Sequence, residues 1–330
     1  MWKTEKSVKI LGNLHREIVM RSGIDPKVDY AFKKLFGSEE NKSILIDLLS
    51  AVLGEQVADA ELLNPFNAKD FASDKETILD VKARLSDGRL VNVEMQMWAD
   101  KFYSSRILHY WSEVHSGQLK EGDDYQVLRP TIGIHFVNGV LFPETDRFHL
   151  TFRPQCMEIP GLPLNDQMVI HLFQLPKFNP DGGKVRTAIE RWCYFLRHGA
   201  DLDRAVLPAS LKTQSIENAL EVLEVISLDE KDRMLYLARV RAQRDIASSR
   251  AEAEQLGEER GALAGRGVGR IQGLSESLVL GMEIKYGTQA LPYIDEVKRI
   301  QKDAKLLELQ RRLYTDITWP EFVAQLHRDE

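Results

Sequence analysis

Two carboxylates, Asp80 and Glu94, are the residues best suited to chemistry in this sequence. They lie in the stretch 77–97, where apolar and polar residues alternate on both sides of the turn residues 86–88. Such alternation is typical of two β-strands, each with one buried face and one wetter face. With Gly88 in the left-handed position of a three-residue turn, the strands form a hairpin in which all the apolar residues face the same side.

This register decides which polar residues of the hairpin face each other. It pairs Lys82 with Asn92 and Asp80 with Glu94, whose Cβ atoms then lie roughly 5 Å apart. Two like charges in such a pair destabilise a sheet. A divalent cation between them would turn the repulsion into coordination, because hard cations bind carboxylate oxygens. The alternative is that one carboxylate is solvated or paired with Lys82.

The same residues resemble the active site of the PD-(D/E)XK nucleases, in which an Asp is followed by a hairpin and then by Glu-x-Lys. Leu79 replaces the Pro of that pattern, and Gln96 replaces its Lys. Glu94-Met95-Gln96 is similar to the branch of recombination-promoting nucleases and transposase-like proteins. Other stretches within 25–174 resemble this branch as well, namely 25–37, the helix with Arg106 and Tyr110-Trp111, and 122–130.

The resemblance implies an α/β fold with a restriction-endonuclease-like mixed β-sheet, flanked by helices and followed by a helical C-terminal region. It also implies a DNA endonuclease in which Asp80 and Glu94 hold Mg²⁺ or, in its place, Mn²⁺. Gln96 projects from the same face as Glu94, and it can only orient water or phosphate, because its amide carries no charge and is no base. We expect Lys82, on the same polar face, to supply the missing cation.

Residues outside the hairpin complete the expected site. In the resembling family an acidic residue of the first helix approaches the metal, and Asp29 occupies the matching place. Its alternative role is that of a first-turn acid favoured by the helix dipole. We expect the guanidinium of Arg106 to contact a substrate phosphate, or else to pair with Glu113 or Asp100. Lys33 is a second candidate for phosphate.

Composition limits the classes of function. The chain has 330 residues, a net charge of −6 and two cysteines. The negative charge argues against a non-specific nucleic-acid coat, so contacts with DNA must come from local basic patches. Two cysteines form no metal motif or disulfide framework, residues 1–20 contain no apolar signal segment, and no apolar run is long enough to span a membrane. We therefore expect a reduced, cytoplasmic protein.

Three further strands and two helices are predicted beyond the hairpin. The strands cover 131–137, 147–152 and 168–175, and the helices cover 101–119 and 184–198. Each of these strands contains a histidine: His135, His149 and His171. Nothing in the spacing of the three histidines indicates a zinc site, so packing in the core or at the sheet edge is favoured.

Changes in composition and hydrophobic pattern divide the chain into five segments. We expect a basic arm at 1–24, a nuclease-like domain at 25–200 and a helical extension at 201–252. A glycine-rich linker or helix at 253–273 and a C-terminal helical segment at 274–330 follow. In the fourth segment glycine recurs every four residues, and each exposed helical Gly costs roughly 1 kcal/mol against Ala. We favour a mobile or weakly helical linker there over a self-association helix. The apolar stripes of the C-terminal helices must bury against something, so a homo-oligomer is expected.

The main alternative is a nuclease-like binding or assembly module that holds DNA or protein without cutting it. The change from Lys to Gln96, the negative net charge and the helical tail all fit this alternative. A histidine-based metalloenzyme is a weaker one. The carboxylate pair distinguishes them, because a nuclease needs both Asp80 and Glu94 and a binding module tolerates their loss.

Overall fold

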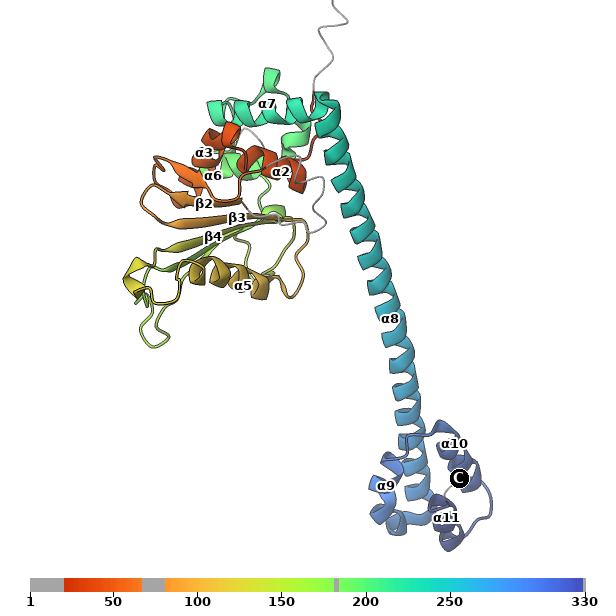
Figure 1. The fold of residues 1–330 in the computed structure, drawn as a ribbon. Coiled ribbons are helices and arrows are strands. Elements are labelled where there is room, and N and C mark those ends of the chain that lie inside the picture. Colours follow the sequence, from red (N-terminus) through yellow and green to blue (C-terminus); the bar gives the residue numbers. More distant parts are fainter. Residues whose placement is uncertain (1–20, 67–80, 181–183, 329–330) are drawn as a thin grey trace, which may run out of the picture. The chain divides into compact units, whose positions relative to one another are not determined.

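The computed structural model describes residues 21–66, 81–180 and 184–328. The chain divides into two compact units, the first ending at Ala242 and the second beginning at Gln243. The first unit contains a mixed β-sheet with helices on both faces (Figure 1). Among the helices of the described ranges, none combines the length and the apolar character that crossing a membrane requires.

Within the described ranges the sheet has six strands, in the order β1-β2-β3-β4-β6-β5. β1, β2 and β3 are antiparallel, β3, β4 and β6 run parallel, and β5 returns antiparallel at the far edge. Their bounds are β1 Ala60–Leu62, β2 Val81–Leu85, β3 Leu90–Gln96, β4 Thr131–Val137, β5 His149–Phe152 and β6 Met168–Gln174. The predicted mixed sheet is thus confirmed, and β4 has the bounds that the sequence predicts.

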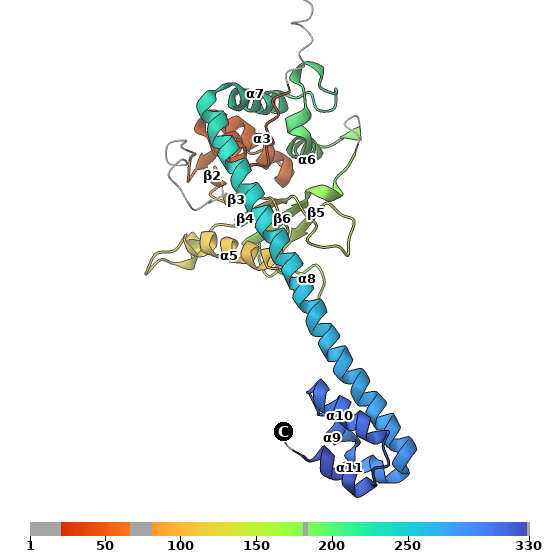
Figure 2. The same cartoon turned by 90° about the vertical axis from the view of Figure 1, so that its right-hand side faces the viewer.

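Helices cover the two faces of this sheet unequally. Among the described residues, one face packs against several helices and the other lies under α5 alone, as Figures 1 and 2 show. The helices of the first face are α2 Asp29–Phe36, α3 Lys42–Leu53, α6 Ala188–His198 and α7 Gln214–Leu228, and α5 is Tyr103–Ser116. α5 and α6 both begin later than predicted; α6 does so because Thr187 caps it in a capping box with Glu190.

The main core lies between the sheet and the helices of the first face. Large side chains such as Phe36, Phe136 and Trp192 are almost fully buried there. α7 contributes Leu220 and Leu223 to the same core, where it packs on α2, α3 and α6, so the helix that follows the predicted boundary near residue 200 belongs to this core. The polar residues under α5 form a separate environment, described below.

The second unit has a small apolar core of its own. It contains the end of α8 (Glu230–Tyr286) together with α9 Ile294–Lys298, α10 Asp303–Leu313 and α11 Trp319–Leu326. Leu306, Leu309 and Leu313 are buried in this core, as their apolar spacing predicts. Residues 253–273 lie within α8. The glycine-rich stretch is therefore helical, whereas its role as a linker or as a self-association helix stays a prediction.

Candidate active site

The hairpin has the register that its alternating pattern predicts. Val81 pairs with Val93 and Lys82 with Asn92. Gly88 has a φ of +90°, as the left-handed position of a three-residue turn requires. Asp80 lies outside the described residues, so its pairing with Glu94 stays a prediction.

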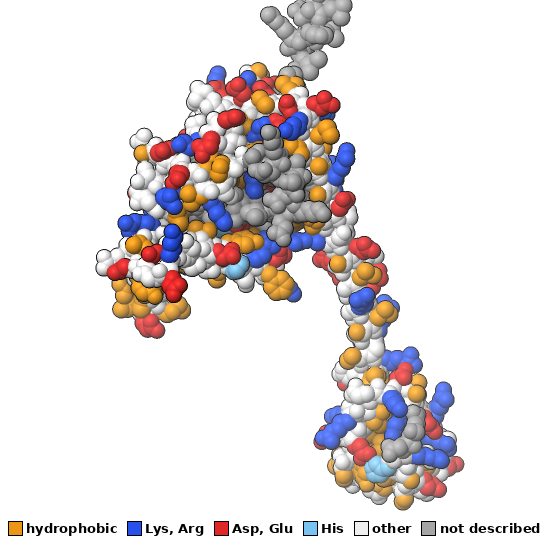
Figure 3. Space-filling view, viewed as in Figure 1, with side chains coloured by type: hydrophobic (Ala, Val, Ile, Leu, Met, Phe, Trp, Pro, Cys, Tyr) orange, Lys and Arg blue, Asp and Glu red, His pale blue; other side chains and the backbone are white. Residues whose placement is uncertain are grey.

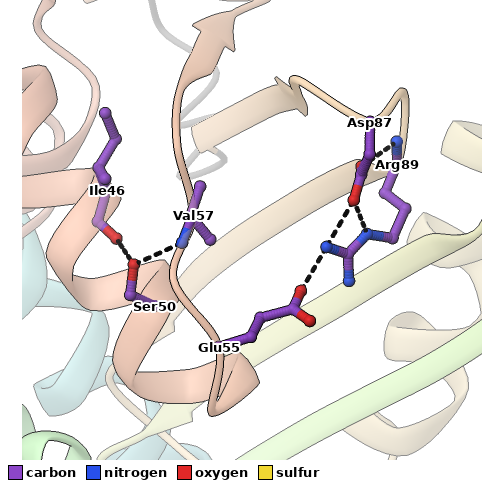
Figure 4. Close-up of polar contacts among 6 residues, drawn as sticks. All are labelled: Ile46, Ser50, Glu55, Val57, Asp87 and Arg89. Carbon is purple, nitrogen blue, oxygen red and sulfur yellow. Dashed lines mark hydrogen bonds and ion pairs between the residues drawn. The ribbon is translucent and has the colours of Figure 1, made fainter.

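Polar contacts tie the hairpin turn to the end of α3. Arg89 donates from Nε to Asp87 at 2.7 Å and also pairs with Glu55, which follows α3 (Figure 4). Ser50 joins the same helix to the chain leading into β1, because its hydroxyl donates to Ile46 O and accepts from Val57 N, both in Figure 4. The turn is therefore held to the segment after α3 through Arg89, and Ser50 holds that segment to the helix.

The polar face of β3 is buried, which corrects the expectation of a wetter face. Asn92, Glu94 and Gln96 are 2%, 4% and 8% exposed. The reason is long-range packing, since α5 lies over this face and contacts both β3 and β4. Burying a carboxylate is costly unless it has hydrogen-bonding partners, so the partners of Glu94 matter.

Three side chains surround the Glu94 carboxylate. Asn92 Nδ2 donates to Oε1 at 3.0 Å, while the Tyr103 hydroxyl and His135 Nδ1 each lie 3.5 Å from Oε2. The Tyr103 hydroxyl is also 3.1 Å from His135 Nδ1. Burial, and then the Glu94 charge, raise the pKa of Tyr103 well above its ordinary value. The tyrosine therefore stays protonated and can donate a hydrogen bond.

His135 and Tyr103 are the neighbours of Glu94 that sequence reasoning missed. The spacing of the histidines favours core or edge packing for His135, and no sequence pattern points to Tyr103 as a site residue. The parallel pairing of Glu94 with His135 brings the histidine to the same face. No local pattern encodes this pairing. The only sequence signal was a histidine at the centre of an otherwise apolar strand.

Gln96 and Arg106 form a second contact beside Glu94. Arg106 Nη2 donates to Gln96 Oε1 at 3.0 Å, and Nη1 lies 3.5 Å from Asp100 Oδ2. The guanidinium carbon is 5.1 Å from the centre of the Tyr103 ring. Of the two ion-pair partners that the sequence suggested for Arg106, the structure has Asp100. The arginine thus places a positive charge directly on the residue that replaces the usual lysine.

Lys82 lies on the α5 side of β2, opposite Asn92 and partly exposed. Its backbone N–H donates to Asn64 Oδ1 at 2.7 Å, and its carbonyl accepts from Leu63 N at 2.8 Å. Because Asn92 contacts Glu94, Lys82 is one residue pair away from the buried carboxylate along the hairpin. This is the neighbourhood in which it was predicted.

Asp29 is buried in the first turn of α2, at 2% exposure. One carboxylate oxygen accepts from Tyr30 N at 2.8 Å, and the other lies 3.4 Å from Arg239 Nε in α8. Burial raises the pKa of Asp29, and the charges of Arg239 and Lys33 act against that rise. Its ion pair thus runs to α8, and the role beside a metal stays a prediction, as does that of Lys33, which is partly buried on the same helix.

The donor atoms around Glu94 fit a hard divalent cation. Besides the carboxylate there is Asn92 Oδ1, a buried oxygen with no hydrogen-bond partner among the residues that the structure describes. Carboxylate and amide oxygens are ligands that Mg²⁺ and Ca²⁺ prefer. Within the described ranges no three His, Cys, Asp or Glu side chains gather as a metal-binding group. Asp80, the second carboxylate of the predicted pair, lies outside these ranges.

Comparison with known families agrees with this geometry. The model of one family, described as PD-(D/E)XK nuclease family transposase, matches residues 26–253. No curated protein and no solved structure matched. The family match includes the hairpin, α5 and both members of the Asp29–Arg239 pair, and the mixed sheet flanked by helices is consistent with the restriction-endonuclease-like fold of such nucleases. Because the match extends over more than half of the sequence, this chain belongs to the PD-(D/E)XK nuclease family transposases.

Proposed function

We propose that this protein is a divalent-metal-dependent DNA endonuclease that hydrolyses phosphodiester bonds at the Glu94 hairpin. The observation that carries the proposal is a carboxylate that is 4% exposed, held by Asn92, Tyr103 and His135 on the hairpin of a nuclease-family chain. Burial of such a charge adds little to stability. Its chemistry is therefore the better explanation of why it lies there.

Glu94 and Asp80 would hold the ion, with Mg²⁺ as the expected metal and Mn²⁺ as a substitute. When bound, the metal supplies a Lewis acid for the phosphate and lowers the pKa of water. Asn92, Tyr103 and His135 fix the orientation of the Glu94 carboxylate. Asp29 is proposed to approach the same site from α2.

The positive charge that the usual lysine provides would come from two other residues. Arg106 contacts Gln96 directly at 3.0 Å, and its guanidinium fork matches the geometry of a phosphate. Lys82 approaches from the neighbouring strand. Gln96 then orients water or phosphate through its amide, and Lys33 is proposed as a further phosphate contact.

The proposal also covers the division of the chain, the location of the protein and its oligomeric state. We propose that residues 25–200 form the nuclease domain, that 201–252 form a helical extension, and that 274–330 form a C-terminal helical segment. We also propose a cytoplasmic location and a homo-oligomer formed through the C-terminal helices.

The proposal is tested by incubating the protein with supercoiled plasmid and Mg²⁺, with EDTA and an Asp80→Ala, Glu94→Ala double variant as controls. The expected result is metal-dependent nicking or linearisation that both controls abolish. Absence of cleavage with Mg²⁺ and Mn²⁺, or equal cleavage by the double variant, would refute the catalytic assignment. Plasmid binding without cleavage would then favour the binding-module alternative.

A Lys82→Ala variant separates the two proposed cations. If Lys82 supplies the positive charge, its loss reduces cleavage. If it cleaves as well as wild type, the role falls to Arg106 alone.

A further inference from the structure

A groove of about 730 Å³ lies on the α5 side of the sheet, near the turn of the hairpin. Its walls come from β2, from the turn, from the C-terminal half of α5 and from the segment that leads into β4. Four bases and one acid line it: Lys82, Arg84, Lys120, Arg129 and Glu113. The lining is therefore mainly basic although the whole chain carries a net charge of −6, and one of its bases, Arg84, pairs with Glu61 at 2.9 Å. Figure 3 shows Lys and Arg side chains around this end of the first unit, on its left.

The groove begins one residue pair away from the Glu94 cluster, at Lys82 of the hairpin. Lys82 pairs with Asn92, whose side chain donates to Glu94 at 3.0 Å. Arg84 follows on the same face of β2, and alternate residues of a strand lie about 7 Å apart. That separation is comparable with the step from one phosphate to the next along a nucleic-acid strand. The bases therefore lead outward from Glu94 at a spacing that suits successive phosphates.

The opposite wall of the groove is held rigidly by Gln118. Its Oε1 accepts from Arg129 N at 3.0 Å, and its Nε2 donates to Arg129 O at 2.9 Å. The Arg129 side chain lies against Gly88, where a Cβ would come within 3.4 Å of its Cγ, Cδ and Nε atoms. Arg129 is thus positioned by its backbone and by the turn, so little conformational entropy is lost when it contacts a phosphate.

The rest of the lining is apolar and suits sugars and bases. Leu63, Leu90, Val114 and Val127 contribute to it. A volume of this size is that of a pocket for a drug-sized ligand. A groove of this size can contact a few nucleotides of one strand. Grooves that track a single strand combine positive charge with such apolar surfaces.

We propose that this groove holds the backbone of one DNA strand, which continues from the bond cleaved at Glu94. The proposal rests on the nuclease function proposed above and adds the path of the substrate. Lys120 and Arg129 contact phosphates at the far wall, while Lys82 and Arg84 contact those nearest the site.

The test measures binding of a fluorescein-labelled oligothymidine of about 20 nucleotides by fluorescence anisotropy, in EDTA and over a series of salt concentrations. Wild type is compared with a Lys120→Ala, Arg129→Ala double variant. We expect at least a tenfold loss of affinity. The slope of log K against log salt should fall by about 1.4, because each phosphate contact on a single strand contributes roughly 0.7.

A matched control removes one lysine and one arginine outside the groove, as Lys212→Ala, Arg186→Ala; both residues are exposed. It should bind as wild type does. Equal binding by the groove variant and wild type overturns the proposal, and so does an equal loss in the control. A loss seen only with a duplex of the same length overturns the assignment to one strand. Melting temperatures of all the proteins show whether a loss of affinity reflects misfolding. An Arg84→Gln variant tests a second residue of the groove in the same way.

This measurement is independent of cleavage, because EDTA removes the metal. Groove-dependent binding without any plasmid cleavage refutes the hydrolytic function alone. Cleavage by wild type together with unchanged binding by the variant refutes the groove alone.

Discussion

The face of the sheet that packs against α2, α3 and α6 is largely apolar, with side chains such as Val93, Ile134 and Phe136 almost fully buried. The face under α5 buries Glu94, Gln96 and His135 to a similar degree. Both faces belong to the same strands, since successive residues of β3 point to opposite sides. Of two neighbouring residues in β3, one therefore lies in the apolar core and the next lies in the polar cluster under α5.

This difference shows which face serves stability. Apolar residues of similar volume in place of a buried ionic cluster are often as stable or more stable. The apolar face follows the rule for a core, whereas the polar face departs from it at the place where the family resemblance locates the active site. Substitutions on the two faces should therefore affect different measurements.

The largest expected effect is on the apolar face. Phe136 is fully buried and stacks on Phe173 with ring centroids 4.7 Å apart. Phe136→Ala should lower the free energy of unfolding by about 3–5 kcal/mol, through lost burial and the cavity left behind. Urea unfolding measures this change. Phe152→Ala, at a ring that is 39% exposed in β5, should lose much less, and an equal loss would contradict the assigned core.

On the polar face, Glu94→Gln should lower cleavage at least about 100-fold, since metal-site changes even beyond the direct ligands cost 10- to 100-fold. The variant keeps the shape of the side chain and removes a buried charge, so the free energy of unfolding should not fall by more than about 1 kcal/mol. Plasmid cleavage and urea unfolding on the same preparations check both values. If Glu94→Gln strongly lowered the free energy of unfolding but left cleavage per folded molecule intact, the polar face would serve stability and not catalysis.

A third prediction concerns the histidines at the sheet edge, where His149 Nε2 lies 3.0 Å from His171 Nδ1. Burial, then the charges of His149 and Arg153, lower the pKa of His171 from 6.5 to about 4. The unfolded chain therefore binds a proton between these values that the folded chain does not. Stability should fall by roughly 3 kcal/mol as the pH drops from about 6.5 to about 4.

A His171→Gln variant should lose most of this pH dependence, as followed by urea unfolding at several pH values. His109→Gln, at a histidine whose side chain is 63% exposed, should keep it. Identical pH profiles for wild type and His171→Gln would show that the pair does not titrate as described.

The smallest effect is expected for Tyr103→Phe, which removes only the hydroxyl beside Glu94 and His135. Cleavage should fall about tenfold, the low end for a residue that orients a metal ligand. Unfolding should change by about 1 kcal/mol, which is typical of one hydrogen bond. Tyr125→Phe serves as the control, because Tyr125 is 79% exposed. Unchanged cleavage in Tyr103→Phe would remove the positioning role.

The hairpin could be predicted from the sequence because its register depends on local alternation and on the glycine of its turn. β4 and β6 were recognised for a similar reason, since each is a short apolar run. The burial of Asn92, Glu94 and Gln96 could not be predicted this way. It depends on α5, whose position over the sheet follows from packing between residues far apart in the chain.

The neighbours of the site show the same limit. The contact of Glu94 with His135 arises from parallel pairing across an intervening helix, and that of Asp29 with Arg239 joins the start of the chain to α8. The glycine-rich stretch 253–273 posed a different difficulty. Its glycines disfavour a helix, while the alanines, glutamates and arginines between them favour one, so composition alone did not decide the structure.

The ion pair between Asp29 and Arg239 has a consequence for how the protein is made. Alongside it, Asp232 accepts from the Tyr30 hydroxyl at 2.7 Å and pairs with Lys34, so three residues of α2 meet partners in α8. The last strand of the sheet ends at Gln174, well before those partners are synthesised. On the ribosome, the sheet is complete in sequence while Asp29 and Lys34 still lack their counter-charges. The nuclease unit can therefore reach its final structure only after Arg239 has left the exit tunnel.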